Sequence, residues 1–475
     1  MARIFNLITR LFRCILKIFA EIFPKTPGIK KLARTLTLPP PINPITLKLS
    51  STRALQLYQL LRIGSVIGAS ILLAKSGLGL TDIGAYEALL YLGSTAAFFW
   101  ANGLLQGIPP VYARLAEPEQ KAFIFNKFLI FAGIALLICG TLWLVRQWAV
   151  PALTGLPEAP QLGWFCLYLF FNLATLPVEY VYLLREKPWS LVGWGMASFG
   201  LYMLVLFLPV YFGYGLEGGL MGLAGLGAMR FVWAVALVGR FGVPEFRPDL
   251  IGYYLRFSAP LVLNLLVGNL VLLFDNWLVG WYFRNEAAFA VFRYGSREFP
   301  LATALATALG TAMIARIATQ PEAGMAELKV KTRRLFHLLF PLTILLLFLS
   351  KPLFPLVFNP AFAASAPLFN IYLLLTASRV LLPNAIILAK SRPRAILLVG
   401  LLELAVKVIL GFLFIHWWGL PGVAWSAVAA FFVEKIGLIW YLEKRLDVRT
   451  GDWLDWRWYA GYVAALFLAW WVAAC

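Results

Sequence analysis

The sequence predicts an all-α, polytopic membrane protein built from two similar six-helix lobes. Three observations support this: the composition, a recurrence of apolar segments of membrane-spanning length, and an internal repeat. Of the 475 residues, 61% are hydrophobic and 13% are charged, whereas a soluble domain is about half apolar and about a quarter charged. Because the chain is too apolar for a water-soluble fold, we expect nearly all of it to lie in a bilayer.

Apolar segments of about 20 residues, enough for a helix to cross roughly 30 Å of hydrocarbon, recur from Tyr58 to the C-terminus. We expect helices here because a helix satisfies its own backbone hydrogen bonds. Our best count is thirteen spans within a range of 12 to 14, with short turns expected at Thr81–Asp82 and Gly419–Pro421. The spans are 57–80, 83–107, 123–149, 162–184, 189–212, 218–240, 254–283, 287–315, 335–358, 366–389, 395–416, 420–442 and 458–474.

The chain divides into four parts. Residues 1–50 are expected to lie in the cytoplasm, where a cationic stripe opposite apolar residues over 1–24 predicts an amphipathic helix on the membrane surface and 35–47 form a proline-rich linker. Residues 51–245 form an N-terminal lobe and residues 246–445 a C-terminal lobe. Residues 446–475 supply an extra transmembrane helix.

The basic residues predict the orientation. The net charge is +19, and 30 of the 41 Lys and Arg fall on the N-terminal segment and the alternate loops on its side, against three on the opposite loops. Cytoplasmic loops of membrane proteins carry this excess. The basic charge is therefore a topology signal rather than a nucleic-acid footprint, and we expect a multi-pass protein of the bacterial cytoplasmic membrane with a cytoplasmic N-terminus.

The internal repeat relates the two lobes. Residues 113–116 (ARLA) close the first helix pair of one lobe, and residues 315–318 (ARIA) close the first pair of the other. Leu61-Arg62 and Leu255-Arg256 occupy matching places earlier in the two lobes. Because six spans separate the copies, they have the same orientation and are related by an axis along the membrane normal, with a central cavity between them.

Eight cations remain inside the spans, where a charge is costly and usually faces a protein interior or a water-filled path. Arg293 and Arg297 are four residues apart, which predicts one shared helix face. Guanidinium groups suit phosphate oxygens, so these residues predict a cavity for an anionic headgroup such as a diphosphate. The alternative is that the cations are paired or reach the interface. The candidate cavity residues are Arg62, Arg230, Arg293, Arg297, Arg379 and Lys407.

Acids inside the spans are candidates for binding a coupling ion, H⁺ or Na⁺. We single out Asp275 and Glu298 for this role, and a structural ion pair is the alternative for each. Glu403 and Lys407 are spaced for a salt bridge within one helix. His337 and His416 are isolated, and no metal spacing is present, so neither a metal nor a cofactor is expected.

The chain resembles the MOP exporter superfamily, in its polysaccharide or Wzx-like flippase branch. The resemblance lies in the parallel repeat, the glycine-bearing turns at 215–218 and 419–424, the segment 82–86 (DIGAY) and the basic loops, and it covers about residues 55 to 442. It implies a transporter that alternates between inward-open and outward-open states. It also implies a cationic cavity and, as cargo, an oligosaccharide linked to undecaprenyl diphosphate. We expect the protein to work as a single chain surrounded by membrane lipids.

Other functions remain open. A multidrug or ion-coupled antiporter of the same superfamily would have the same fold, but its cavity should favour acids that bind cationic drugs. A membrane enzyme would need catalytic groups on a substantial external loop, and the longest one, near 147–162, has Glu158 as its one acid and no His. We rank a flippase first, an antiporter second and an enzyme a distant third.

Overall fold

The computed structural model describes residues 50–157, 159 and 161–474, apart from the side chains of residues 52, 98, 99, 264, 267 and 268. Over these residues the secondary structure is helical, without strands. The predicted amphipathic helix at 1–24 and linker at 35–47 lie outside the described residues.

Each of the thirteen predicted spans is found as a helix or a helix with breaks. The N-terminal lobe contains α3 (Ser51–Ala74), α4 (Leu80–Tyr112), α5 (Glu117–Leu144), α6 (Arg146–Thr154), α7 (Leu162–Ala174), α8 (Val178–Leu184), α9 (Pro188–Tyr211) and α10 (Gly215–Phe241). The C-terminal lobe contains α11 (Pro248–Phe283), α12 (Glu286–Gly295), α13 (Pro300–Thr319), α14 (Pro321–Val357), the short η1 (Pro360–Phe362), α15 (Ser365–Leu373), α16 (Leu375–Arg379), α17 (Pro383–Ala389), α18 (Pro393–Trp418) and α19 (Leu420–Arg445). The chain then continues through α20 (Thr450–Trp453) and α21 (Trp456–Ala474).

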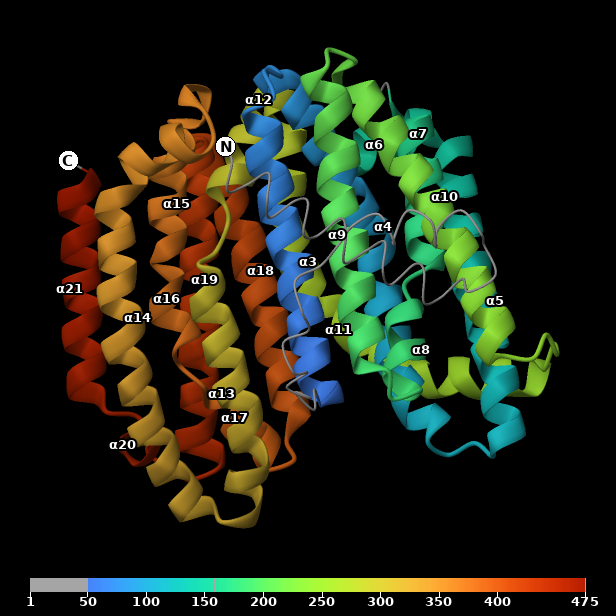
Figure 1. The fold of residues 1–475 in the computed structure, drawn as a ribbon. Coiled ribbons are helices and arrows are strands. Elements are labelled where there is room, and N and C mark those ends of the chain that lie inside the picture. Colours follow the sequence, from blue (N-terminus) through green and yellow to red (C-terminus); the bar gives the residue numbers. More distant parts are fainter. Residues whose placement is uncertain (1–49, 158, 160, 475) are drawn as a thin grey trace, which may run out of the picture.

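Length and composition make ten of the helical segments in the described part able to cross a membrane, and the bent α4 makes eleven. The helices α11 and α21, which that count does not include, lie alongside them in Figure 1. The turn expected at Thr81–Asp82 lies earlier, since α3 ends at Ala74 and α4 begins at Leu80. The chain is therefore a multi-pass membrane protein.

The two lobes repeat the same helix pairings. In the N-terminal lobe α3 packs on α9 and α9 on α10, and in the C-terminal lobe α11 packs on α18 and α18 on α19. The fourth span of each lobe is interrupted at a proline: Pro177 precedes α8, and Pro383 begins α17. Proline removes a backbone donor and disfavours helix in the residue before it, so the chain breaks at matching places.

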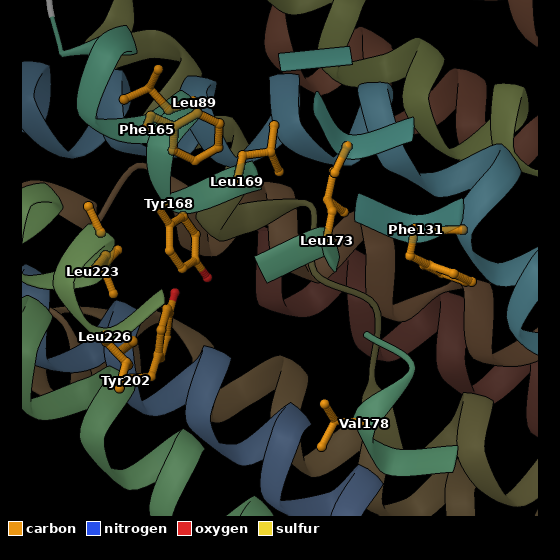
Figure 2. Packing of buried hydrophobic residues seen from close by; sticks show 14 of the residues in the cluster. Leu89, Phe131, Phe165, Tyr168, Leu169, Leu173, Val178, Tyr202, Leu223 and Leu226 are labelled. Atoms are coloured by element: carbon orange, nitrogen blue, oxygen red, sulfur yellow. The ribbon is translucent and has the colours of Figure 1, made fainter. Parts of the chain in front are cut away.

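One core lies mainly in the N-terminal lobe, where aromatic and aliphatic side chains of α4, α7, α9 and α10 pack together, and it extends to Tyr254 and Tyr294 of the C-terminal lobe. Figure 2 shows Tyr168 and Tyr202 with their hydroxyl groups turned toward one another and Leu89 beside Phe165. The Tyr202 hydroxyl group also lies 2.7 Å from that of Tyr86. A second core, centred on α14, α15 and α19, fills the C-terminal lobe and includes residues of α21.

The lobes touch at one end, which we call the α12 end; it is the upper end in Figure 1, where α6, α12 and α15 lie. They also touch farther along α4, where Gly103 and Gly107 lie against Val262 and Ser258 of α11. A Cβ atom on Gly84 would collide with the backbone carbonyl of Glu286, and one on Gly280 with that of Thr154. Only glycine permits so close an approach. Asn359 also donates a hydrogen bond to the Ala74 carbonyl across the lobes, at 2.7 Å.

A candidate cargo cavity between the lobes

A cavity of about 530 Å³ lies between the lobes. It is lined on one side by α3 and α4 and on the other by α11, the α12–α13 break, α15, α18 and α19. Its charged lining residues are Arg62, Glu87, Asp275, Arg293, Arg297, Glu298 and Lys407. Six of the eight residues that we singled out from the sequence are in this set.

The other two residues, Arg230 and Arg379, are not among the residues that line the cavity. Arg230 is buried inside the N-terminal lobe, where its guanidinium group donates to the Ser198 carbonyl and to Asn172 Oδ1. Arg379 stands behind the cavity wall, bound to Glu298. The structure therefore does not bring Arg230 to the cavity, and it brings Arg379 there only through a partner.

Arg293 and Arg297 do not share a helix face, contrary to our expectation. The helix α12 ends at Gly295 and α13 begins at Pro300, so Arg297 lies in the break between them. The break falls where a proline disfavours helix in the residues before it. Both side chains nevertheless converge on one carboxylate, because the break turns Arg297 toward the same neighbour.

That carboxylate belongs to Glu87 on α4, in the opposite lobe. Arg293 Nε lies 3.1 Å from Glu87 Oε2, and Arg297 Nη2 lies 3.6 Å from Oε1. The Glu87 side chain is 3% exposed and those of both arginines 27%. Arg297 also donates to Ser70 Oγ on α3, at 2.8 Å. These contacts link the lobes beside the α12 end, and together we call them the interlobe latch.

The other charged wall residues of the C-terminal lobe are Lys407, Asp275 and Glu298, and they are paired within that lobe. Lys407 Nζ lies 3.0 Å from Asp275 Oδ2, to which the Tyr372 hydroxyl group also donates, at 2.9 Å. Arg379 holds Glu298 through two parallel bonds of 2.9 and 2.6 Å, with its guanidinium group over the Phe431 ring. The salt bridge expected between Glu403 and Lys407 is absent from the described ion pairs, because Lys407 turns to Asp275 instead.

Arg62 differs from the other cations of the cavity. Its side chain is exposed on α3, and no described ion pair includes it. Glu87, Tyr372 and Ser70 were not singled out from the sequence, nor was Asn276, which accepts a hydrogen bond from Arg293 at 3.4 Å. Glu87 is three residues after Gly84, so the small residue at the lobe contact was the one signal that pointed to it.

The described residues contain no group of three or more His, Cys, Asp or Glu residues arranged to hold a metal ion. The cavity instead offers guanidinium and ammonium donors, three carboxylates and one tyrosine hydroxyl group. These groups can bind an anion or exchange ionic partners.

Comparison with solved structures identifies the fold. The fold is that of the MOP-superfamily transporters. The lipid II flippase MurJ, in an inward closed conformation, matches with a TM-score of 0.63 and 15% sequence identity over 87% of this chain and 92% of its own. An outward-facing multidrug resistance MATE transporter of the MOP superfamily matches with a TM-score of 0.54 and 17% identity, over 88% of this chain and 97% of its own.

A third structure is a MOP-superfamily transporter from Pyrococcus furiosus, described as having a binding pocket of reverse polarity. It matches with a TM-score of 0.50 and 14% identity, over 88% of this chain and 97% of its own. No family model and no curated protein matches the sequence. The comparisons therefore establish the fold, and the cargo has to be argued from the cavity of this chain.

Proposed function

We propose that this protein is a flippase that moves an oligosaccharide linked to undecaprenyl diphosphate across the bacterial cytoplasmic membrane, for polysaccharide synthesis. The observation that carries the proposal is the cavity between the lobes, where arginines from the C-terminal lobe meet an apolar wall. The cargo requires both features, because it has an anionic diphosphate attached to a long hydrocarbon chain.

The charge balance of the cavity favours an anion. Four cations and three acids line it, an excess of one positive charge, and Arg379 behind Glu298 raises the excess to two. Arg293 and Arg297 share a single carboxylate, so one guanidinium charge of that group is not neutralised. A diphosphate offers the paired oxygen atoms that guanidinium groups bind best.

The size and the lining fit an amphiphilic cargo. A volume of about 530 Å³ is in the range of small-ligand sites, roughly 300–1,000 Å³, and suits a diphosphate with its first sugars. The wall beside the charged groups is apolar and includes Ile63 and Val66, which are about half exposed on α3. A hydrocarbon chain that leaves the headgroup along this wall stays in an apolar environment.

The interlobe latch suggests how cargo drives the conformational change. While Glu87 holds Arg293 and Arg297, the lobes are joined beside the α12 end. A diphosphate that binds both arginines takes the place of Glu87. The latch then opens because the arginines have a stronger anionic partner, and the lobes are free to separate at that end. Cargo binding and gate opening are thus coupled through a shared pair of side chains.

The charge distribution of the loops gives this scheme a direction. With the N-terminus in the cytoplasm, the α12 end faces outward, so the interlobe latch lies toward the outer side of the membrane. The protein then loads cargo from the cytoplasmic leaflet and works as a single chain. Asp275 and Glu298, our candidates for ion coupling, are each held by a cation and exchange partners only when that cation moves.

The second candidate is a multidrug or ion-coupled antiporter, which the MATE fold and the buried acids favour. A cationic drug would have to enter a cavity with an excess of positive charge, close to two guanidinium groups. We therefore rank this function below the flippase.

Deletion of the gene in its native host tests the proposal. We expect complete lipid-linked repeat units to accumulate on the cytoplasmic face, and a plasmid copy of the wild-type gene to clear them. Arg316→Ala is a matched control, since Arg316 pairs with Glu327 outside the cavity, and it should restore export. Normal glycan together with increased sensitivity to cationic drugs would instead support the antiporter.

A further inference from the structure

One cluster of charged side chains inside the C-terminal lobe contains one acid more than it has cations. Four carboxyl groups and three cationic side chains meet between α11, the α12–α13 break, α16, α18 and α19. The acids are Asp275, Glu298, Glu403 and Glu434, and the cations are Arg379, Lys407 and Lys435.

Each cation is already bound to an acid. Arg379 is bound to Glu298 and Lys407 to Asp275, as described above. Lys435 Nζ lies 2.9 Å from Glu434 Oε2. The other oxygen of Glu434 accepts a hydrogen bond from Asn384 Nδ2, at 3.4 Å. Three pairs therefore account for all three cations, and Glu403 is the acid left over.

Glu403 is also the acid with the least support from polar neighbours. It is 6% exposed on α18, and its Oε1 atom is buried without a hydrogen-bond partner. The charged groups that face it are Lys407 from its own helix, Glu434 and Lys435 from α19 and Arg379 from α16. The three cations among them are those already bound to other acids, and Glu434 repels a negative charge on Glu403.

We propose that Glu403 is a proton-binding site, which holds a proton in the state shown here and releases it during transport. An isolated carboxylate in an apolar interior is expensive, so the neutral acid is favoured unless a cation arrives. Binding forms one O–H bond on the carboxyl group, release breaks it, and nothing is oxidised or reduced.

The release step follows from the position of Lys407, one helical turn from Glu403 on α18. When Lys407 leaves Asp275 for Glu403, its ammonium group stabilises the Glu403 carboxylate, and the proton passes to the Asp275 carboxylate, which has lost its cation. Asp275 lines the cavity, so a conformational change there alters the proton affinity of Glu403. This coupling rests on the proposed transport function, whereas the proton site itself does not and is measurable without cargo.

Infrared difference spectroscopy on the purified, cargo-free protein at neutral pH tests the site. We expect the spectrum of the wild type minus that of Glu403→Gln to contain the C=O stretching band of a buried, protonated carboxyl group, because the variant lacks this group. Glu322→Gln is the control, because Glu322 is exposed in the first turn of α14. A band of equal intensity in the wild type and in Glu403→Gln would overturn the proposal.

Thermal unfolding in detergent provides the second measurement. Glutamine has the shape of a neutral glutamic acid, so Glu403→Gln should unfold within a few degrees of the wild type, whereas Glu403→Ala should unfold at a lower temperature. Strong destabilisation by Gln would show a charged, paired carboxylate and contradict the proposal. If Na⁺ raised the unfolding temperature of the wild type but not of Glu403→Gln, the site would bind a metal ion, and the proposal would again be contradicted.

A transport assay in liposomes tests the coupling. Glu403→Gln should abolish the dependence of transport on the proton gradient.

Discussion

Glu87 of α4 and Arg293 of α12 form a partly buried ion pair between two lobes of the molecule, with Glu87 Oε2 and Arg293 Nε 3.1 Å apart. The two residues are 206 positions apart in the sequence. Arg297 completes the contact from the helix break. The Glu87 carboxylate is thus the partner of both the Arg293 and the Arg297 guanidinium groups. The first two predictions follow from this shared carboxylate.

The first prediction concerns the latch. Glu87→Gln should shift the lobes toward separation at the α12 end, because both arginines then lose the negative charge that joins them to the opposite lobe. Spin labels at Tyr214 and Trp417, both exposed, should report longer distances by double electron–electron resonance, in a chain whose native cysteines are replaced by Ser. Unchanged distances would show that the pair does not hold the lobes together.

The second prediction concerns cargo binding. Arg293→Ala should lower the affinity for undecaprenyl diphosphate at least tenfold, because it removes a charge-assisted hydrogen-bond donor from the cavity. Glu87→Gln should raise the affinity, since the carboxylate that competes for the arginines is gone. Binding to protein in detergent micelles measures both. If Glu87→Gln weakened binding as much as Arg293→Ala, the exchange of partners would be wrong.

The third prediction concerns the pair behind the cavity wall. Arg379→Met or Glu298→Gln alone should lower the unfolding temperature, because each leaves a partly buried charge without its partner. The double variant Arg379→Met/Glu298→Gln should recover much of the loss. Thermal unfolding of all four proteins completes the double-mutant cycle. Additive losses would indicate that the two residues do not interact.

The fourth prediction concerns the glycine contact at the α12 end. Gly84→Ala should prevent full closure of the lobes and abolish transport while leaving each lobe folded, because the added methyl group collides with the Glu286 carbonyl. Gly64→Ala is the matched control, since nothing lies within 4 Å of a Cβ atom there. Transport by Gly84→Ala at the level of Gly64→Ala would show that this approach is dispensable.

Much of the fold was predictable because it depends on local properties of the chain. The thirteen apolar segments coincide with helices, and the repeat of ARLA at 113–116 and ARIA at 315–318 anticipated two lobes with the same helix pairings. Helix ends were less predictable. The second span runs on to Tyr112, through Pro109 and Pro110, although we ended it at 107.

The ion pairs of the cavity were not predictable, because they depend on which helices become neighbours. Spacing placed Lys407 beside Glu403 on one helix, yet its ammonium group contacts Asp275 on α11. Hydropathy alone does not distinguish Arg230, buried within one lobe, from Arg293, which reaches the other. The helix break before Pro300 could have been predicted, since proline disfavours helix in the preceding residue. We predicted one continuous span because the residues on both sides of the break are apolar.

The central claim is that this protein carries a diphosphate-linked lipid across a membrane through the cavity between its lobes. Its most direct test is a liposome assay with the purified protein and a fluorescent undecaprenyl-diphosphate sugar, in which a membrane-impermeant quencher reports the fraction of cargo in the outer leaflet. We expect the wild type and Arg316→Ala to redistribute the probe, and Arg293→Ala/Arg297→Ala to reduce the rate at least tenfold. Equal rates in the wild type, the double variant and protein-free liposomes would contradict the claim.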